Sequence, residues 1–224
     1  MRYYPIYLDL KDRLCVVVGG GEVAERKVRS LLDSQARVRV ISPRLNSGLE
    51  GLRRESRIAH RPKEFEEGDL EGAFLVIGAT DDSRVNSHVG VRARERGALV
   101  NLVDDAEGSD FIAPSVVVRG DLVLSISTGG KSPALARQIR QELEVRYGPE
   151  YAVFLELMGE LRKEIIELFP DPARREKVFL SLVRSNILQW IARGDNSLAR
   201  EEARSILMRN LEHEGVEANE YRPL

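Results

Sequence analysis

The sequence predicts an α/β protein in which a Rossmann-type, doubly wound parallel sheet is followed by a hairpin and an all-helical C-terminal region. Strand-length apolar runs alternate with amphipathic stretches up to about residue 113, a pattern typical of parallel sheets covered by helices. Three consecutive glycines separate the first strand from the first helix. From Pro133 onward the pattern is helical throughout.

Each element of the first half has its own signal. Leu14–Val18 is an apolar, valine-rich run that stops at glycine, as a strand buried on both faces does. Val23–Leu32 places apolar residues on one side and charges on the other, which indicates a helix. The further expected elements are strand Val38–Ile41, helix Leu45–Arg54, a short strand near Ile58, strand Phe74–Ala79, helix Ser83–Arg96 and strand Ala98–Val103.

The second half begins with a hairpin. Strands Ser115–Arg119 and Leu122–Ser127 flank Gly120-Asp121, a two-residue turn with glycine first. Helices are then expected over Pro133–Tyr147, Tyr151–Leu168, Arg175–Ala192 and Ser197–Leu211, before a polar, frayed tail from Glu214. The expected domains are residues 1–113 for dinucleotide binding, 114–148 for a dimerisation hairpin and helix, and 149–224 for a helical domain.

Composition excludes several classes of protein. The net charge of -2, from 34 basic and 36 acidic residues, does not favour nucleic acid as a partner. The apolar runs are too short to cross a bilayer, and the N-terminus lacks the apolar core of a signal peptide. Cys15 is the only cysteine, so no intrachain disulfide can form and a cytoplasmic location is expected.

The glycine segment predicts a dinucleotide site. Gly19–Ala24 fits the pattern G-x-G-x-x-A between a strand and a helix, where glycines permit a tight turn and let a pyrophosphate approach the helix N-terminus. The alternative is an ordinary glycine-rich turn that binds nothing. The second strand ends at Ser42-Pro43-Arg44, without the carboxylate that usually bonds the adenosine ribose of NAD. The residues themselves therefore leave NAD and NADP both open.

Four separated segments together resemble one family. They are Val17–Lys27, Ala79–Asp82, Asn101–Asp104, and Phe111–Ser115 leading to Ser127–Pro133. In this order they resemble the precorrin-2 dehydrogenase family, which comprises the N-terminal module of siroheme synthase and its stand-alone relatives. The likeness runs from about Tyr4 to Glu142.

The resemblance implies oxidation of precorrin-2 to sirohydrochlorin with NAD rather than NADP. It also implies a homodimer in which the hairpin and the first long helix form the subunit contact. Some members additionally insert ferrous iron to give siroheme, and the motifs do not distinguish the two kinds. The methyltransferase domain of the multifunctional members is missing, so that activity is expected on another chain.

The resemblance also implies roles for individual residues. Matched positions are Gly20, Gly21, Glu22 and Val23 for the pyrophosphate, Pro43 and Arg44 for the adenosine side, Thr80 for the nicotinamide cleft, and Asp104 for catalysis. Thr128 stands where some relatives have serine.

Asp104 follows a parallel strand, at the edge where such sheets bind ligands. A carboxylate there can take the proton that the macrocycle releases as its conjugation extends. The alternative is a turn or capping aspartate, which is common after a strand. Asp105 is the rival for the base, since a shift of one position exchanges the two.

A polar glycine loop, Ser127–Pro133, leads into a helix and is suited to anions. Thr128, Gly129, Gly130 and Lys131 are therefore candidates to bind the carboxylates of the tetrapyrrole. Arg137 and Arg140 lie beyond the loop, and for each of them a solvated helix charge is an equally good interpretation.

Other residues are better explained by structure. The three histidines lack metal-site spacing, so no metal site is predicted. Cys15 is predicted to be a buried apolar residue, and Asp81-Asp82 is predicted to form a helix N-terminus. Trp190 is predicted to belong to an apolar core face of a helix, together with Phe179, Leu182, Val183, Ile187 and Ile191. A different class of function, an NAD-binding sensory module without catalysis, has no need of the Asp104 segment together with the glycine loop.

Overall fold

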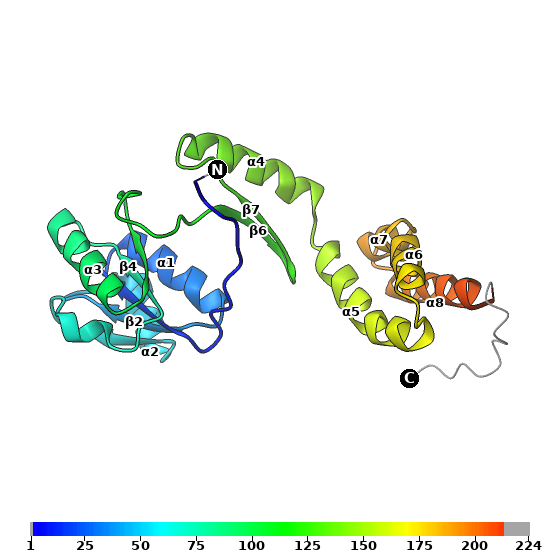
Figure 1. Ribbon diagram of the computed structural model, residues 1–224, viewed down its shortest axis with the longest axis horizontal. Helices are drawn as coiled ribbons and strands as arrows, with labels where there is room; N and C mark the ends of the chain where they lie inside the picture. Colours follow the sequence, from blue (N-terminus) through cyan, green and yellow to red (C-terminus); the bar gives the residue numbers. More distant parts are fainter. Residues whose placement is uncertain (1, 213–224) are drawn as a thin grey trace. The chain divides into compact units, whose positions relative to one another are not determined.

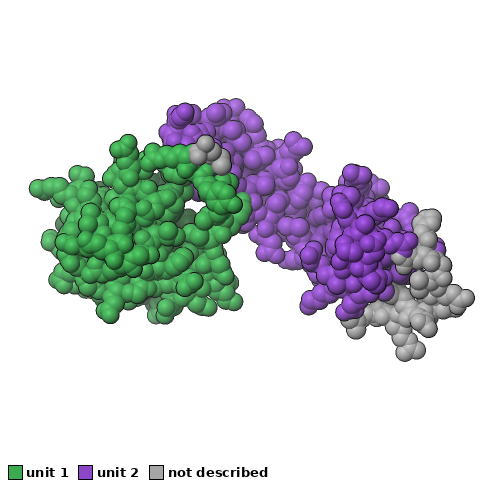
Figure 2. Space-filling model, in the orientation of Figure 1, with its two compact units in different colours: residues 1–113 green, residues 114–224 purple. Residues whose placement is uncertain are grey.

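The computed structural model describes residues 2–212, which fall into two compact units divided between residues 113 and 114 (Figure 2). Each unit has its own hydrophobic core. Within the described residues, no helix has both the length and the apolar character needed to span a membrane.

The first unit is built on a five-stranded parallel sheet with strand order β3-β2-β1-β4-β5 (Figure 1). Every neighbouring pair is parallel, so the predicted doubly wound sheet is confirmed. The strands are β1 (Leu14–Val18), β2 (Arg37–Ile41), β3 (Ile58–Arg61), β4 (Leu75–Gly78) and β5 (Leu99–Leu102).

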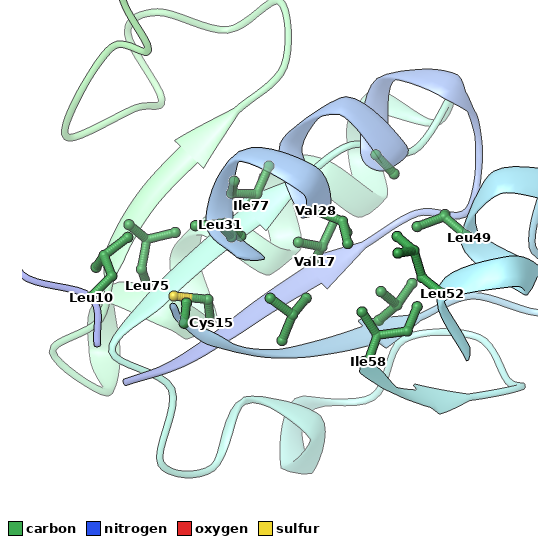
Figure 3. Packing of buried hydrophobic residues seen from close by; sticks show 14 residues of the cluster. Leu10, Cys15, Val17, Val28, Leu31, Leu49, Leu52, Ile58, Leu75 and Ile77 are labelled. Carbon is green, nitrogen blue, oxygen red and sulfur yellow. The ribbon is translucent and has the colours of Figure 1, made fainter. Parts of the chain in front are cut away.

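Helices cover both faces of this sheet. Helices α1 (Glu22–Asp33) and α2 (Ser47–Arg54) pack on one face, against Val17, Val40 and Ile77 among others (Figure 3). Helix α3 (Ser83–Glu95) and the 3-10 turn η1 (Glu67–Leu70) cover the opposite face. The alternation of neighbouring strand residues between these two cores explains why the strands are apolar without interruption.

The strands end level with one another at their carboxyl ends. Val18 is in register with Ile41 on one side and with Gly78 on the other, and Gly78 is in register with Leu102. Chain order reverses between β1 and β4, and open α/β sheets bind ligands at such a switch point. The loops after this row therefore define the candidate site.

The second unit begins with the antiparallel hairpin β6 (Ser115–Arg119) and β7 (Leu122–Ile126). Gly120 has a φ of +56° whereas Asp121 is not among the residues with positive φ, as a glycine-first turn requires. Five helices follow, and the last four bury a separate apolar core. They are α4 (Pro133–Arg146), α5 (Glu150–Leu168), α6 (Pro172–Val183), α7 (Ile187–Ala192) and α8 (Asn196–Glu212).

The prediction of one helix over 175–192 is wrong, because the chain breaks it between α6 and α7. The Ser185 hydroxyl donates to Leu182 O at 2.7 Å and accepts from Ile187 N at 3.2 Å. A serine that bonds the local backbone in this way competes with the helical hydrogen bonds. Because of the break, the residues predicted to share one apolar helix face do not all face the core. Val183, one of them, is 57% exposed. The tail from Glu214 lies outside the described residues.

Candidate cofactor and catalytic site

The glycine turn lies at the switch point, and its first two glycines are required by close backbone approaches. Gly19 has a φ of +133°, and a Cβ there would lie 2.2 Å from Ala79 O. At Gly20 a Cβ would lie 2.0 Å from Arg44 O. A Cβ at Gly21 would meet nothing within 4 Å. Packing within the protein therefore leaves open space beside Gly21.

Helix α1 starts at this open space. Gly21 is its N-cap and supplies no capping side chain, so the N–H groups of the first turn, including those of Glu22 and Val23, are available to an anion. Glu25 instead ties the helix to the loop after β2, accepting from Asn46 Nδ2 at 2.6 Å. Hydrogen bonds from Arg29 and then Asn46 lower the pKa of Glu25. An uncapped helix N-terminus facing open space fits a dinucleotide pyrophosphate.

The loop after β2 forms the adenosine side of the site. Ser42 is buried, and its hydroxyl donates to Arg44 O at 2.6 Å. His60 Nε2 lies 2.9 Å from Ser42 O. Pro43 and Arg44 are exposed. The main chain at Arg44 is thus fixed against Gly20 while its guanidinium extends into solvent.

Thr80 is the second residue beyond Gly78 in the row of strand ends. Its side chain is engaged by Asn86 of α3, whose Oδ1 lies 2.8 Å from Thr80 Oγ1. Asn86 also accepts from Thr80 N at 3.1 Å and donates to Thr80 O at 2.9 Å. Asn86 was not among the predicted site residues, although an asparagine at a buried position of an amphipathic helix indicates such a role.

Asp104 is likewise the second residue beyond Leu102, so it emerges at the same edge as Thr80. It occupies a turn that starts at Leu102 and ends at Asp105, with a φ of +62°. Asp tolerates this left-handed conformation better than most residues do, but at a cost relative to glycine. The Asp104 side chain is exposed and makes no hydrogen bond or ion pair within residues 2–212.

Asp105 is placed differently. It is half-buried, and its Oδ1 accepts from Gly108 N at 2.7 Å. Its carboxylate therefore holds the loop together. The structure separates two aspartates that the sequence left as rivals.

The predicted substrate loop belongs to the second unit. Gly129 and Gly130 have φ values of +61° and +82°, and a Cβ at either would meet nothing within 4 Å. The Thr128 hydroxyl accepts from Ser132 N at 3.1 Å, and Ser132 caps α4 by accepting from Leu135 N. Lys131 is exposed. The loop is ordered by its own bonds, in which Gly129 N donates to Ser127 Oγ at 3.0 Å and Lys131 N donates to Thr128 O at 3.2 Å. Gly130 N has no hydrogen-bond partner within the described residues.

The two arginines beyond this loop differ in their contacts. Arg140 is half-buried and paired with Glu144. Arg137 is exposed and has no ion pair within the described part of the chain. Arg140 thus has a structural partner of its own.

Several residues have the structural roles expected of them. Cys15 is fully buried (Figure 3), and burial raises the pKa of its thiol to about 11. Asp82 caps α3 by accepting from Arg84 N at 2.8 Å. Trp190 packs against the helical core and donates to Glu202 at 2.6 Å. Residues 2–212 hold no cluster of three or more His, Cys, Asp or Glu side chains able to bind a metal.

Three family models match the chain in succession. A model described as NAD(P)-binding matches residues 6–115, one described as sirohaem biosynthesis protein central matches 119–146, and one described as sirohaem synthase dimerisation region matches 150–207. The chain belongs to the precorrin-2 dehydrogenase and siroheme synthase family. Its first unit is accordingly a nicotinamide-cofactor domain.

Individual members of the family are similar to the chain along nearly its whole length. Siroheme synthases of Thioalkalivibrio sulfidiphilus and Nitrosospira multiformis are 37% and 38% identical to the chain, over 95% and 97% of its length. The alignments cover 43% and 46% of those proteins, so the chain spans less than half the length of these curated relatives. A solved structure, SirC, precorrin-2 dehydrogenase, matches with a TM-score of 0.73 at 26% identity, covering 93% of this chain and 98% of that chain.

Proposed function

We propose that this protein oxidises precorrin-2 to sirohydrochlorin in siroheme biosynthesis, with NAD as the hydride acceptor. The observation that carries the proposal is the Asp104 carboxylate, which has no hydrogen bond or ion pair within residues 2–212 and lies at the strand-end row that also carries the glycine turn. Membership of the family supplies the substrate class, and the match to SirC, precorrin-2 dehydrogenase, supports it along nearly the whole chain.

The reaction removes one hydride and one proton from precorrin-2. When bound, NAD would supply the acceptor for the hydride. The N–H groups of Gly20, Gly21, Glu22 and Val23 would hold its pyrophosphate, and Thr80 would border its nicotinamide. The Thr80 hydroxyl and backbone already have protein partners, so the methyl group is the part of Thr80 that would contact the nicotinamide.

Asp104 accepts the proton. Its carboxylate is exposed and has no competing donor within residues 2–212, whereas that of Asp105 is occupied by Gly108 N. A positioned carboxylate base accelerates such a step by about a hundredfold or more. In a member that also inserts ferrous iron, the same carboxylate can take the pyrrole protons displaced by the metal.

NAD fits the adenosine side better than NADP. The Ser42 hydroxyl donates to Arg44 O, so its proton is already used, and Arg44 is left as the exposed cation of this loop. A 2′-phosphate needs several donors for good recognition. Pro43 and the Arg44 backbone then contact the adenosine.

In this proposal the loop Thr128, Gly129, Gly130 and Lys131 binds substrate carboxylates, with the Gly130 N–H and the exposed Lys131 ammonium as the donors. The protein acts as a homodimer in the cytoplasm. The family model described as a dimerisation region matches 150–207, which follows the hairpin and helix expected to form the subunit contact. The place of that contact stays a prediction.

The experiment is to incubate the protein with precorrin-2 and NAD and to follow NADH and sirohydrochlorin by absorbance. Equal amounts of both products are expected, with no conversion when NAD is left out. Ferrous iron is added afterwards, and the siroheme spectrum reports insertion separately. Binding of NAD without any oxidation of precorrin-2 would contradict the enzyme and favour a sensory module.

A further inference from the structure

The loop that carries Asp104 folds back along β5. Asp110 N donates to Val100 O at 2.8 Å, and Val100 N donates to Asp110 Oδ2 at 2.9 Å. At the next residue of β5, Asn101 Nδ2 donates to Phe111 O at 2.9 Å. These bonds attach the far end of the loop to the strand. Asp104 therefore stands at the near end of a segment whose other end is fixed.

One hydroxyl joins the two ends of the Asp104 turn. Ser109 Oγ accepts from Leu102 N at 2.8 Å and donates its single proton to Asp105 O at 2.6 Å. Leu102 is the last residue of β5 and Asp105 closes the turn. The direct backbone bond between these residues, from Asp105 N to Leu102 O, is longer at 3.3 Å.

We propose that Ser109 is a positioning residue for the reaction, acting through the turn on the Asp104 carboxylate. This inference rests on the proposed function, in which Asp104 is the base. The left-handed conformation of Asp104 is disfavoured by roughly 1 kcal/mol, so the turn opens readily unless other bonds oppose it. The Ser109 hydroxyl supplies two such bonds, because it bonds both ends of the turn at once.

The geometry limits what Ser109 does. Its hydroxyl bonds only backbone atoms of the turn and strand within the described residues. The Asp110 bonds to Val100 do not involve it. Loss of the hydroxyl therefore frees the turn without releasing the loop from β5.

The test starts with Ser109→Ala. We expect kcat for precorrin-2 oxidation to fall about tenfold to a hundredfold, the scale for a small misplacement of a catalytic group. KM for precorrin-2 and Kd for NAD should stay within about twofold, because the Ser109 hydroxyl bonds backbone atoms of the turn and strand. Ser34→Ala is the matched control, since it removes an exposed hydroxyl at the C-cap of α1 that bonds only Ser30 O within the described residues, and its kcat should be unchanged.

A double-mutant cycle separates positioning from general loosening. In an Asp104→Asn background, Ser109→Ala should change kcat by less than about twofold, because no base remains to be positioned. An equal loss in both backgrounds overturns the proposal, as does a normal kcat for Ser109→Ala. If the alanine variant does not fold, Ser109→Cys, a near-isosteric weak donor, replaces it in the cycle. If the unsubstituted protein does not oxidise precorrin-2, the proposed function fails, and this proposal fails with it.

Discussion

Asp105 Oδ1 lies 2.7 Å from Gly108 N and accepts its hydrogen bond, while the carboxylate of the preceding Asp104 is exposed. In the proposed reaction the exposed carboxylate meets substrate, whereas the bonded one holds the loop. Adjacent residues of one type can differ in this way because the turn directs successive side chains to different surroundings.

The first prediction tests this division. Asp104→Asn should lower kcat for precorrin-2 oxidation by about a hundredfold or more, because the amide cannot accept the proton. Fold and NAD affinity should be retained, since the amide is nearly isosteric and the cofactor rests on the glycine turn. Thermal unfolding, NAD titration and initial rates measure the three quantities.

Asp105→Asn is the matched control. Its amide oxygen can still accept from Gly108 N, so kcat should fall by no more than a few-fold. The reverse result, with Asp104→Asn active and Asp105→Asn inactive, would move the base by one position. If both variants remain active, no carboxylate of this turn is the base.

The sequence predicted the parallel sheet because buried strands such as Leu14–Val18 are apolar and end at turn residues. It also predicted a site at the strand ends, because open parallel sheets bind ligands beyond the carboxyl ends of their strands. It did not predict Ser109, since the role of Ser109 depends on a bond across seven residues that no local pattern encodes. Asn86 was not predicted either, although an asparagine at a buried helix position could have indicated it. The break at Ser185 was missed because the apolar spacing of α6 and α7 is helical on both sides.

A second prediction concerns two neighbouring glycines. Gly20→Ala should destabilise the protein without cofactor, because its Cβ would fall 2.0 Å from Arg44 O and the backbone must move. Gly21→Ala should leave the melting temperature nearly unchanged, since its Cβ meets no protein atom within 4 Å. Both should weaken NAD binding by about tenfold or more, the Gly21 variant by occupying the space for the pyrophosphate.

Melting curves and NAD titrations of the two variants give the result. If Gly21→Ala binds NAD normally, the pyrophosphate does not approach this residue and the assigned cradle is wrong.

A third prediction is that NAD binds more tightly than NADP. The Ser42 hydroxyl is already committed to Arg44 O, which leaves few donors for a 2′-phosphate. Fluorescence titration with both cofactors measures the ratio of Kd values. Arg44→Ala should weaken NADP binding more than NAD binding, because a guanidinium pairs strongly with a phosphate. Tighter binding of NADP to the unsubstituted protein would refute the prediction.

A fourth prediction is a homodimer that uses the hairpin. Val118 on β6 is 54% exposed, and an apolar side chain on a two-stranded sheet needs a cover. Val118→Lys should shift the protein toward monomer in light scattering at micromolar concentration. Val91→Lys is the control, since Val91 is similarly exposed, at 50%, on α3 of the other unit. An unsubstituted protein that is monomeric excludes the dimer, and a dimeric Val118→Lys variant places the contact elsewhere.

The fifth prediction concerns a buried carboxylate in the first unit. Asp69 is 1% exposed and accepts from Arg61 Nη1 at 2.5 Å and from Glu66 N at 3.0 Å, with Lys63 Nζ at 3.3 Å. Burial alone raises the pKa of Asp69, but the hydrogen bonds from Arg61, Glu66 and Lys63 outweigh it, and the pKa lies below its ordinary value of 3.8. The folded protein therefore keeps this carboxylate charged at a pH where the unfolded chain protonates it.

The sign of the pH effect follows from that shift. Because the pKa of Asp69 is lower in the folded protein, its charged carboxylate contributes its full stabilisation of the fold above about pH 3.8. That stabilisation is lost as the pH falls through the lower pKa of the folded state. Asp69→Asn should cost about 2 kcal/mol at pH 7, the scale for weakening hydrogen bonds to a charged group whose cationic partners are half-buried. The difference from the unsubstituted protein should shrink below pH 3.8, in urea unfolding followed by circular dichroism. Asp33→Asn, an exposed carboxylate at the end of α1, should cost little at any pH. If the difference in the free energy of unfolding between the two proteins is the same at pH 7 and pH 3, Asp69 stabilises the fold through its shape rather than through its charge.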